Sequence, residues 1–254
     1  MDLKIDVCIH VFPKKEIAFL MKKAKIKERI GTSHRSYHLL NCNQRLNFSR
    51  KKSNLHEAQL NFQLLTPFGL NEIPDLNEIS EMINSSFKLP KIYLNDHLLN
   101  IKNAIILHPK SQGSALEWPF QKYKQLAQKL LEKGETITFT GTENEGKLFR
   151  DEIPKHPNCF DLTGKMTLEQ LIVFISQSKS LVACSTGPFH LAGILGIKAI
   201  GLFSSRRPIH PGRWRALGRN VHIIEYDPNC KLCKKGKVCH CIKNIEVETV
   251  FDKI

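Results

Sequence analysis

The segment from Ser185 to His190, which reads Ser-Thr-Gly-Pro-Phe-His, places a hydroxyl, an imidazole and backbone N–H groups at the expected start of a helix. Thr186 suits the N-cap position, and Pro188 suits the first turn, where its missing N–H costs nothing. Because a helix N-terminus offers free N–H groups and the positive end of the helix dipole, this segment predicts an anion site, with phosphate as the best-fitting anion. The simpler alternative is a strand–turn–helix corner with a surface histidine.

Two other polar loops also follow strand-like segments directly. Residues 109–118 offer hydroxyl, amide and backbone donors, and residues 141–145 include Glu143, which can accept a hydrogen bond from a ribose hydroxyl. In an open α/β sheet, ligands bind beyond the carboxyl ends of the strands, so we expect both loops to share one crevice with residues 185–190. This chemistry suits a nucleoside diphosphate. The sequence has neither a Walker A loop nor a GxGxxG motif, which argues against kinase and dehydrogenase functions.

Four of the eight cysteines are clustered near the C-terminus, at Cys230, Cys233, Cys239 and Cys241. The two-residue gap of the first pair is typical of tetrahedral zinc ligation. The single-residue gap between Cys239 and Cys241 is unusual for zinc, so the sequence favours reduced free thiols over a structural metal. The other four cysteines are scattered and are expected to be small core residues.

The chain as a whole is basic: its 254 residues include 38 Lys and Arg against 24 Asp and Glu, a formal net charge of +14 at pH 7. Such a charge favours anionic partners such as nucleic acid, lipid head groups or phosphorylated small molecules. Aromatic residues do not interleave with the basic clusters as a nucleic-acid platform requires. The longest apolar stretches are strand-sized and the N-terminus lacks the apolar core of a signal peptide, so we expect a cytoplasmic protein without a transmembrane segment.

The elements that must position these loops alternate between strand-like and helix-like from residue 104 onward, which predicts a parallel sheet with helices on both faces. The expected strands are 104–107, 136–140, 181–184, 199–203 and 221–225. The expected helices are 120–131, 147–152, 168–175 and 190–195, with a last helix running from a cap at Asn244 through Val250. Earlier in the chain, 5–11 is expected to be a strand, and 16–24, 56–65 and 76–83 are expected to be helices, followed by an interdomain connection at 88–102.

Four motifs at these strand ends occur in a fixed order. They are His108-Pro109-x-Ser111-x-Gly113-Ser114 with Trp118-Pro119, Thr140-Gly141-Thr142-Glu143, Leu162-Thr163-Gly164-Lys165-Met166-Thr167-Leu168-Glu169, and Ser185-Thr186-Gly187-Pro188-x-His190-Leu191-Ala192. Together they resemble the donor-binding domain of glycosyltransferase family 9, the lipopolysaccharide heptosyltransferases of Gram-negative bacteria. The resemblance is strong from residue 104 to 204 and looser before that.

The resemblance implies a GT-B architecture of two Rossmann-like, doubly wound α/β domains. It implies an incomplete acceptor-side domain at residues 1–98 and a nucleotide-sugar-binding domain at 99–254. The donor-binding residues that it implies are Ser111, Gln112, Glu143, Met166, Ser185, Thr186, Gly187 and His190. In the family, the first two positions contact the diphosphate, the methionine position packs on the adenine, and the last three bind phosphate.

The chain departs from the family pattern at several positions. Ser185 stands where many members have an aspartate that is thought to hold sugar hydroxyls, and Leu116 stands where lysine is frequent. Lys110, Arg206 or Arg207 can replace that lysine's charge. Residues 5–31 resemble a strand, helix and Arg-Ile-Gly turn from the middle of the family's N-terminal domain, so the units that carry a Gly-Asp loop and the proposed general base are expected to be missing. The catalytic base is therefore unassigned, with Asp6, His10 and Glu16 as local candidates.

The resemblance implies an inverting, metal-independent glycosyltransferase without a cofactor. It would transfer heptose or a related sugar from an ADP-sugar to a lipopolysaccharide core acceptor at the inner face of the inner membrane. A base removes the acceptor proton while preorganised donors stabilise the departing ADP. Two alternatives stay open: a catalytically impaired GT-B remnant that binds nucleotide only, and a basic module that binds zinc or nucleic acid.

Overall fold

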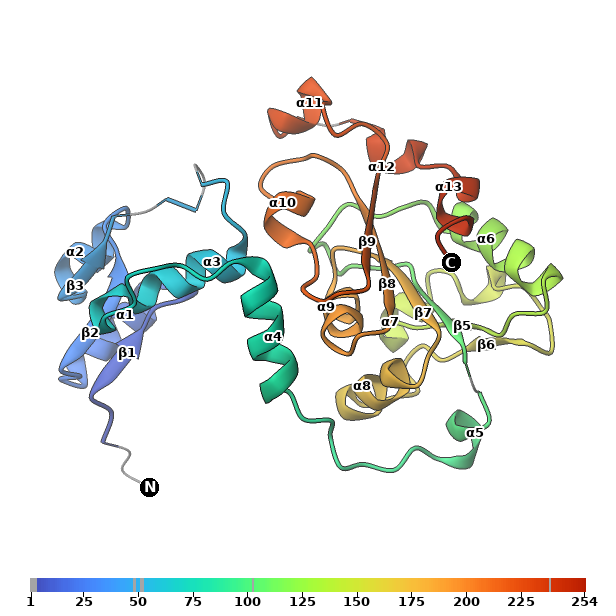
Figure 1. Cartoon of the computed structure of the whole chain (residues 1–254), viewed down its shortest axis with the longest axis horizontal. Coiled ribbons are helices and arrows are strands. Elements are labelled where there is room, and N and C mark those ends of the chain that lie inside the picture. The colour runs from blue at the N-terminus through green and yellow to red at the C-terminus, as the bar shows by residue number, and fades with distance from the viewer. Residues whose placement is uncertain (1–3, 48, 51–52, 102, 238) are drawn as a thin grey trace. The chain divides into compact units, whose positions relative to one another are not determined.

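The structure is a computed structural model that describes residues 4–47, 49–50, 53–101, 103–237 and 239–254. The chain forms two compact units, Met1–Leu76 and Asn77–Ile254, which are labelled by element in Figure 1. The domain boundary that the sequence predicts at residue 98 stays a prediction. Among the described residues, no helix combines the length and apolar character that crossing a bilayer requires.

The first unit contains a parallel three-stranded sheet in the order β1-β2-β3. Its elements are β1 (Val7–Ile9), α1 (Lys15–Lys23), β2 (Glu28–Thr32), α2 (Ser36–Asn41), β3 (Gln44–Leu46), α3 (Glu57–Phe62) and the 3-10 helix η1 (Gln63–Phe68). Gly31 lets α2 approach β2 closely, because a Cβ there would lie 2.8 Å from His38 Nδ1 and 2.9 Å from Cys42 Sγ. The predicted first strand and first helix are confirmed, whereas β2, where a turn was expected, and β3 were not predicted.

The second unit is built on a parallel six-stranded sheet in the order β6-β5-β4-β7-β8-β9. Its strands are β4 (Ile105–His108), β5 (Ile137–Phe139), β6 (Cys159–Asp161), β7 (Ser180–Cys184), β8 (Lys198–Phe203) and β9 (Val221–Glu225). From β4 the chain adds β5 and then β6 toward one edge of the sheet. It then returns to place β7 on the other side of β4, and it adds β8 and β9 toward the opposite edge. This is the strand order of a Rossmann fold, in which the order reverses between the two central strands.

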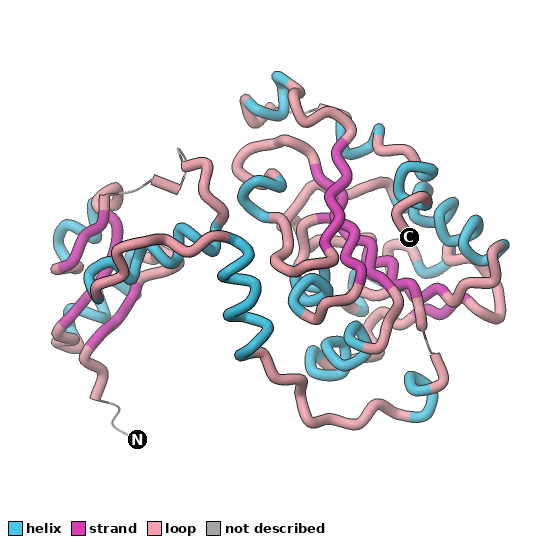
Figure 2. The backbone as a smooth tube through the Cα atoms, viewed as in Figure 1, coloured by secondary structure: helices cyan, strands magenta, loops and turns pink. Residues whose placement is uncertain are grey.

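Helices cover both faces of this sheet, as the cyan and magenta segments of Figure 2 show. The helical elements from Leu76 onward are α4 (Leu76–Ser86), α5 (Asp96–Leu99), α6 (Phe120–Glu132), α7 (Glu143–Gly146), the 3-10 helix η2 (Arg150–Glu152), α8 (Leu168–Ser176), α9 (Gly187–Ile194), α10 (Pro211–Trp214), α11 (Lys231–Lys234), α12 (Cys241–Asn244) and α13 (Val247–Phe251), and not all of them lie on the sheet. Two buried apolar clusters result, one formed with α6 and α13 and the other with α5, α8 and α9. The predicted doubly wound α/β architecture is confirmed.

The structure corrects two predicted helices. In place of a helix over 147–152, α7 begins at Glu143 and is followed by η2, because Thr142 and Glu145 form a capping box that starts the helix earlier. In place of a single last helix capped by Asn244, α12 ends at that residue and α13 starts after Glu246. The edge strand β6 was not predicted.

Candidate functional site

A cavity of about 540 Å³ lies at the carboxyl ends of the central strands of the second unit. Its wall comes from the loops after β4, β5, β6 and β7, so the prediction that the loops at 109–118, 141–145 and 185–190 share one crevice is confirmed. The loop after β6 adds a fourth side. Because the strand order reverses between β4 and β7, the cavity occupies the place where open α/β sheets bind their ligands.

The N-terminus of α9 forms one end of this cavity. Thr186 holds the N-cap position as predicted, but its side chain accepts no capping hydrogen bond, and Pro188 lies in the first turn. Thr186 Oγ1 is buried, and among the described residues it has no hydrogen-bond partner. The first-turn N–H groups of Gly187 and Phe189 have no intrahelical acceptor either. Together these donors at the positive end of the helix suit an anion.

The loop after β4 folds into a tight turn beside this helix. Ser114 N donates to Ser111 O at 2.9 Å, and the two central residues, Gln112 and Gly113, have φ values of 49° and 79°. Positive φ at both positions is the pattern of a type I′ turn, which a non-glycine residue such as Gln112 adopts only under constraint. Ser114 Oγ contacts Ser185 O at 3.4 Å, which joins this turn to the loop after β7.

Glu117 organises the same loop, although no motif in the sequence marks it as a site residue. Its Oε1 accepts from Ser111 N at 2.9 Å and from Ser111 Oγ at 3.0 Å, while Oε2 accepts from Lys110 Nζ at 2.8 Å. Partial burial alone would raise the pKa of Glu117, but the bonds from Lys110 and Ser111 outweigh it and hold the pKa below its ordinary value. The side chain of Ser111 therefore stabilises the loop, and Lys110 lies at the cavity wall beside Glu117.

His108, at the end of β4, lies on the floor of the cavity. Its Nδ1 is 2.9 Å from Thr140 Oγ1 at the end of β5. Burial lowers the pKa of His108 to about 4, against a smaller opposing effect of Glu145 and Glu117. The imidazole is therefore neutral at physiological pH and acts as a hydrogen-bonding group, so the positive character of the cavity comes from Lys110 and the α9 N-terminus.

One wall of the cavity is apolar. It comprises Met166 together with Leu162, Leu168 and Leu171, contributed by the end of β6 and by α8. Met166 is half-buried and packs against the core on one side, so its other side is available to a ligand. A flat aromatic ring such as a nucleobase fits this surface, since thioethers pack well on aromatic faces.

The acid of this cavity is Glu145 rather than the predicted Glu143. Glu143 lies outside the cavity wall, and its carboxylate pairs with Arg150, with Oε2 2.8 Å from Nη2. Glu145 lines the cavity and accepts from Thr142 N and Thr142 Oγ1 at 2.8 and 2.9 Å. The spacing Thr142-x-x-Glu145 is a capping-box signature, and this signal could have pointed to Glu145 in the sequence, where only Glu143 was predicted.

A second hollow of about 270 Å³ adjoins the first. Residues 112–114 and 185–186 separate the two, since Gln112, Ser114 and Thr186 line the first and Gly113 and Ser185 line the second. The second hollow contains Leu116 and Ser185, the two positions where the chain departs from the family pattern. Arg206 and Arg207 line it as well.

The structure thus places the eight residues implied as donor contacts in three groups. Five of them line the first cavity: Ser111, Gln112, Met166, Thr186 and Gly187. Ser185 lines the second hollow, and Glu143 and His190 line neither. His190 lies in the second turn of α9, with ring centroids 5.6 Å from Phe189 and 6.5 Å from Trp214. The donor contacts themselves stay predictions.

In the first unit, His10 was one of the candidate bases. Its Nε2 accepts from Lys14 N at 2.9 Å, next to the start of α1, and its Nδ1 is 2.9 Å from His38 Nε2. Burial, followed by the charge of His38, lowers the pKa of His10. Because both ring nitrogens are engaged within the protein, this geometry does not favour His10 as a base. Asp6 and Glu16 are exposed.

The strand order, the cavity at its reversal point and the helix N-terminus beside it define a Rossmann-like α/β unit, the kind of unit from which GT-B folds are built. The profile of glycosyltransferase family 9 (heptosyltransferase) matches residues 5–242, and the chain belongs to this family.

Three known proteins show how far the similarity reaches. Lipooligosaccharide heptosyltransferase 2 of Campylobacter jejuni subsp. jejuni serotype O:6 is 23% identical over 227 residues, which cover 85% of this chain and 69% of that protein. The E. coli ADP-heptose lps heptosyltransferase II has the same fold, with a TM-score of 0.64 and 16% identity over 94% of this chain and 72% of its own. E. coli heptosyltransferase WaaC with ADP gives a TM-score of 0.66 and 15% identity, and the match covers 98% of this chain and 72% of that protein.

Proposed function

We propose that this chain transfers a heptose, or a related sugar, from an ADP-sugar to a lipopolysaccharide core acceptor. The observation that carries the proposal is the unpartnered hydroxyl of Thr186. Of the buried side-chain atoms that lack a partner among the described residues, Thr186 Oγ1 alone belongs to a residue lining the first cavity. An unsatisfied buried hydroxyl costs about 1–3 kcal/mol, which a phosphate oxygen at the α9 N-terminus would recover.

The two hollows suggest how the donor lies. The adenine packs on the apolar wall at Met166, the ribose faces Glu145, and the pyrophosphate lies against Thr186 and Gly187. The sugar then points toward the second hollow, where Arg206 and Arg207 supply the charge that the family more often draws from a lysine at the position of Leu116. The printed names of the E. coli relatives, one for ADP-heptose and one with ADP, support an adenine nucleotide.

The transfer forms a bond between the acceptor oxygen and the anomeric carbon as the bond from that carbon to the β-phosphate oxygen breaks. The acceptor proton passes to a base, and the leaving ADP takes the electron pair. The α9 N–H groups, Thr186 and Lys110 stabilise the charge that grows on ADP, and they do so without a metal ion. The acceptor is anionic and lies at a membrane surface, to which a protein of charge +14 is attracted at low salt.

The test is calorimetry with ADP on the wild type and on Thr186→Val, which removes the hydroxyl at constant volume. Losing a hydrogen bond to a charged group is expected to weaken ADP binding about 10- to 100-fold. Thr138→Val is the matched control. Thr138 Oγ1 is also buried and has no hydrogen-bond partner among the described residues, but Thr138 lines neither hollow. Equal affinities for the three proteins would contradict the phosphate site.

Activity is tested separately by incubating the protein with ADP-heptose and a heptose-free lipopolysaccharide core. Release of ADP together with a heptosylated product supports the transferase. Binding of ADP without any product would point instead to a GT-B protein that binds nucleotide only. Oligonucleotide binding without affinity for ADP would point to the basic nucleic-acid module.

A further inference from the structure

Four cysteine thiols that play no part in the proposed transfer converge after β9. The Sγ atoms of Cys230, Cys233, Cys239 and Cys241 all lie within 4.8 Å of one another. All four are free cysteines, and the Sγ atoms of Cys233 and Cys239 are 2.6 Å apart. Their segment includes α11 and α12, at the top of the view in Figure 1.

The local fold explains how residues so close in sequence gather their thiols at one point. Cys230 caps α11, and Cys233 lies one turn later on the same side of that short helix. Gly236, with φ of 70°, then reverses the chain. Cys241 begins α12, and His240, which precedes it, is exposed. The chain therefore bends between Cys239 and Cys241, and the single-residue gap does not prevent both thiols from facing the first pair.

We propose that these four thiolates bind one zinc ion tetrahedrally. With Zn–S bonds of about 2.3 Å, the sulfurs of such a site stand about 3.8 Å apart. That distance lies inside the 4.8 Å that bounds the cluster, and the Cys233 and Cys239 sulfurs, 2.6 Å apart, would separate by about 1 Å on binding the ion. A four-iron cluster would hold the thiolates farther apart, since it places several atoms between them. Calcium and magnesium prefer oxygen ligands. Among divalent ions, four soft thiolate ligands in a tetrahedral arrangement favour zinc.

The charge of the surrounding segment fits this assignment. Four thiolates and one Zn²⁺ leave a net charge of −2. Four lysines, Lys231, Lys234, Lys235 and Lys237, belong to the same segment and offset that charge.

The site would hold a loop of the second hollow in place. Arg207 N donates to Cys233 O at 3.3 Å, and Ser205 Oγ donates to Asp227 O at 3.1 Å. These two bonds connect the loop that carries Arg206 and Arg207 to the segment on either side of Cys230. The zinc is therefore a structural ion that fixes the arginines, and it takes no part in the transfer itself.

The experiment begins with the wild-type protein purified under reducing conditions without chelator and analysed by inductively coupled plasma mass spectrometry. One zinc per chain is expected. Cobalt exchanged into the same protein should give the thiolate charge-transfer bands and the strong visible absorption of tetrahedral sulfur ligation. This spectroscopic readout needs no variant, so it holds even where a cysteine variant fails to fold.

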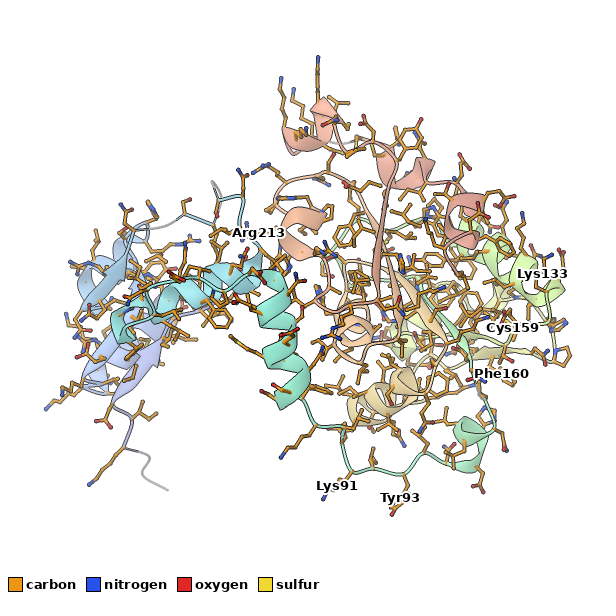
Figure 3. All side chains as sticks on the ribbon, viewed as in Figure 1. Lys91, Tyr93, Lys133, Cys159, Phe160 and Arg213 are labelled. Carbon is orange, nitrogen blue, oxygen red and sulfur yellow. The ribbon has the colours of Figure 1, made fainter. Side chains whose placement is uncertain are left out.

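The variants then locate the metal. Cys230→Ser and Cys239→Ser are each expected to lose the zinc and the cobalt spectrum. Cys159→Ser is the control, because Cys159 lies on β6, away from α11 in the shared view of Figures 1 and 3. Metal-free protein with four reactive thiols in this segment, or a Cys233–Cys239 disulfide found by peptide mass spectrometry, would overturn the proposal. So would zinc that every variant retains.

Discussion

At the scale of single residues, the site depends on which polar atoms are already paired within the protein. Ser111 Oγ lies 3.0 Å from Ala115 O and 3.0 Å from Glu117 Oε1, so its single proton is donated within the loop. Thr186 differs from it, because its hydroxyl is buried at the cavity wall without a described partner. Sequence motifs treat these two hydroxyls alike. The structure favours Thr186 as the one that a ligand satisfies.

Gly187 gives a residue-level test of the space reserved for phosphate. A Cβ added there meets nothing within 4 Å, and the glycine has no positive φ, so Gly187→Ala fits the fold. The new methyl enters the cavity that Gly187 lines and narrows the approach of a phosphate to the helix N–H groups. We expect ADP affinity to fall at least about 10-fold, close to 1.4 kcal/mol, without loss of thermal stability. Calorimetry and thermal unfolding measure the two quantities.

Gly134→Ala is the matched control, and we expect it to lower stability while leaving ADP affinity unchanged. A Cβ at Gly134 also meets nothing within 4 Å, but the residue has φ of 80° and follows α6 at its C-terminal end. A non-glycine residue there costs about 1 kcal/mol of stability and leaves the cavity untouched. If both variants bind ADP as the wild type does, the phosphate does not lie at Gly187.

At the scale of elements, α9 is positioned by close backbone approaches. A Cβ at Gly201 on β8 would lie 2.4 Å from Phe189 Cζ, and a Cβ at Gly193 on α9 would lie 2.5 Å from Leu217 O. Phe189 is fully buried and lies in the first turn of α9. Small residues therefore let the helix settle against the sheet, and this contact sets where its N-terminus points.

Gly201→Ala tests whether this packing sets the site. Overpacking against Phe189 is expected to cost about 1–3 kcal/mol of stability and, because the first turn of α9 shifts, to weaken ADP binding as well. Chemical unfolding and calorimetry measure both effects. The double variant Gly201→Ala/Phe189→Leu removes the clashing ring atoms and is expected to recover part of each loss. If Gly201→Ala loses the expected stability but binds ADP as tightly as the wild type, the packing of Phe189 against β8 does not determine the geometry of the site.

The elements that the sequence predicts well are those with strong apolar patterns. Strands β7 and β9 and helix α6 appear within a residue or two of their predicted bounds, because buried strands and a 3.6-residue stripe are local signals. Strands β2 and β3 are short and partly polar, and β6 is a three-residue edge strand, so their pairing with neighbours defines them. That information is not local.

The candidate site also has features that local sequence predicts and features that it does not. The motifs locate the loops, since each follows a predictable strand. They do not locate Glu117, whose role depends on a turn that brings it back to Ser111, or show that Glu143 turns away to Arg150. The cysteine cluster is a further case, because only the bend at Gly236 and the start of α12 bring the two halves of the motif together.

At the scale of the whole molecule, the stability of the second unit depends on pH through His108. The pKa of this histidine is about 4 in the folded chain, because of burial, against 6.5 as the ordinary value. Between these values the unfolded chain binds a proton that the folded chain excludes, so stability falls as pH falls from about 6.5 toward 4. At pH 4.5 the loss attributable to His108 is about 2–3 kcal/mol relative to pH 8.

Urea unfolding at pH 8 and pH 4.5 measures this loss. Both tryptophans of the chain, Trp118 and Trp214, belong to the second unit, so their fluorescence reports on that unit alone. His108→Gln keeps a hydrogen-bonding group opposite Thr140 and is expected to lower stability at pH 8 but to flatten the dependence on pH over this range. His10 and His38, whose pKa values are also lowered, lie in the first unit and do not contribute to this signal. An equal loss in the variant and the wild type would show that His108 is not the group that titrates. Acid would then act on this unit through other groups, among them His210, whose pKa is also lowered by burial.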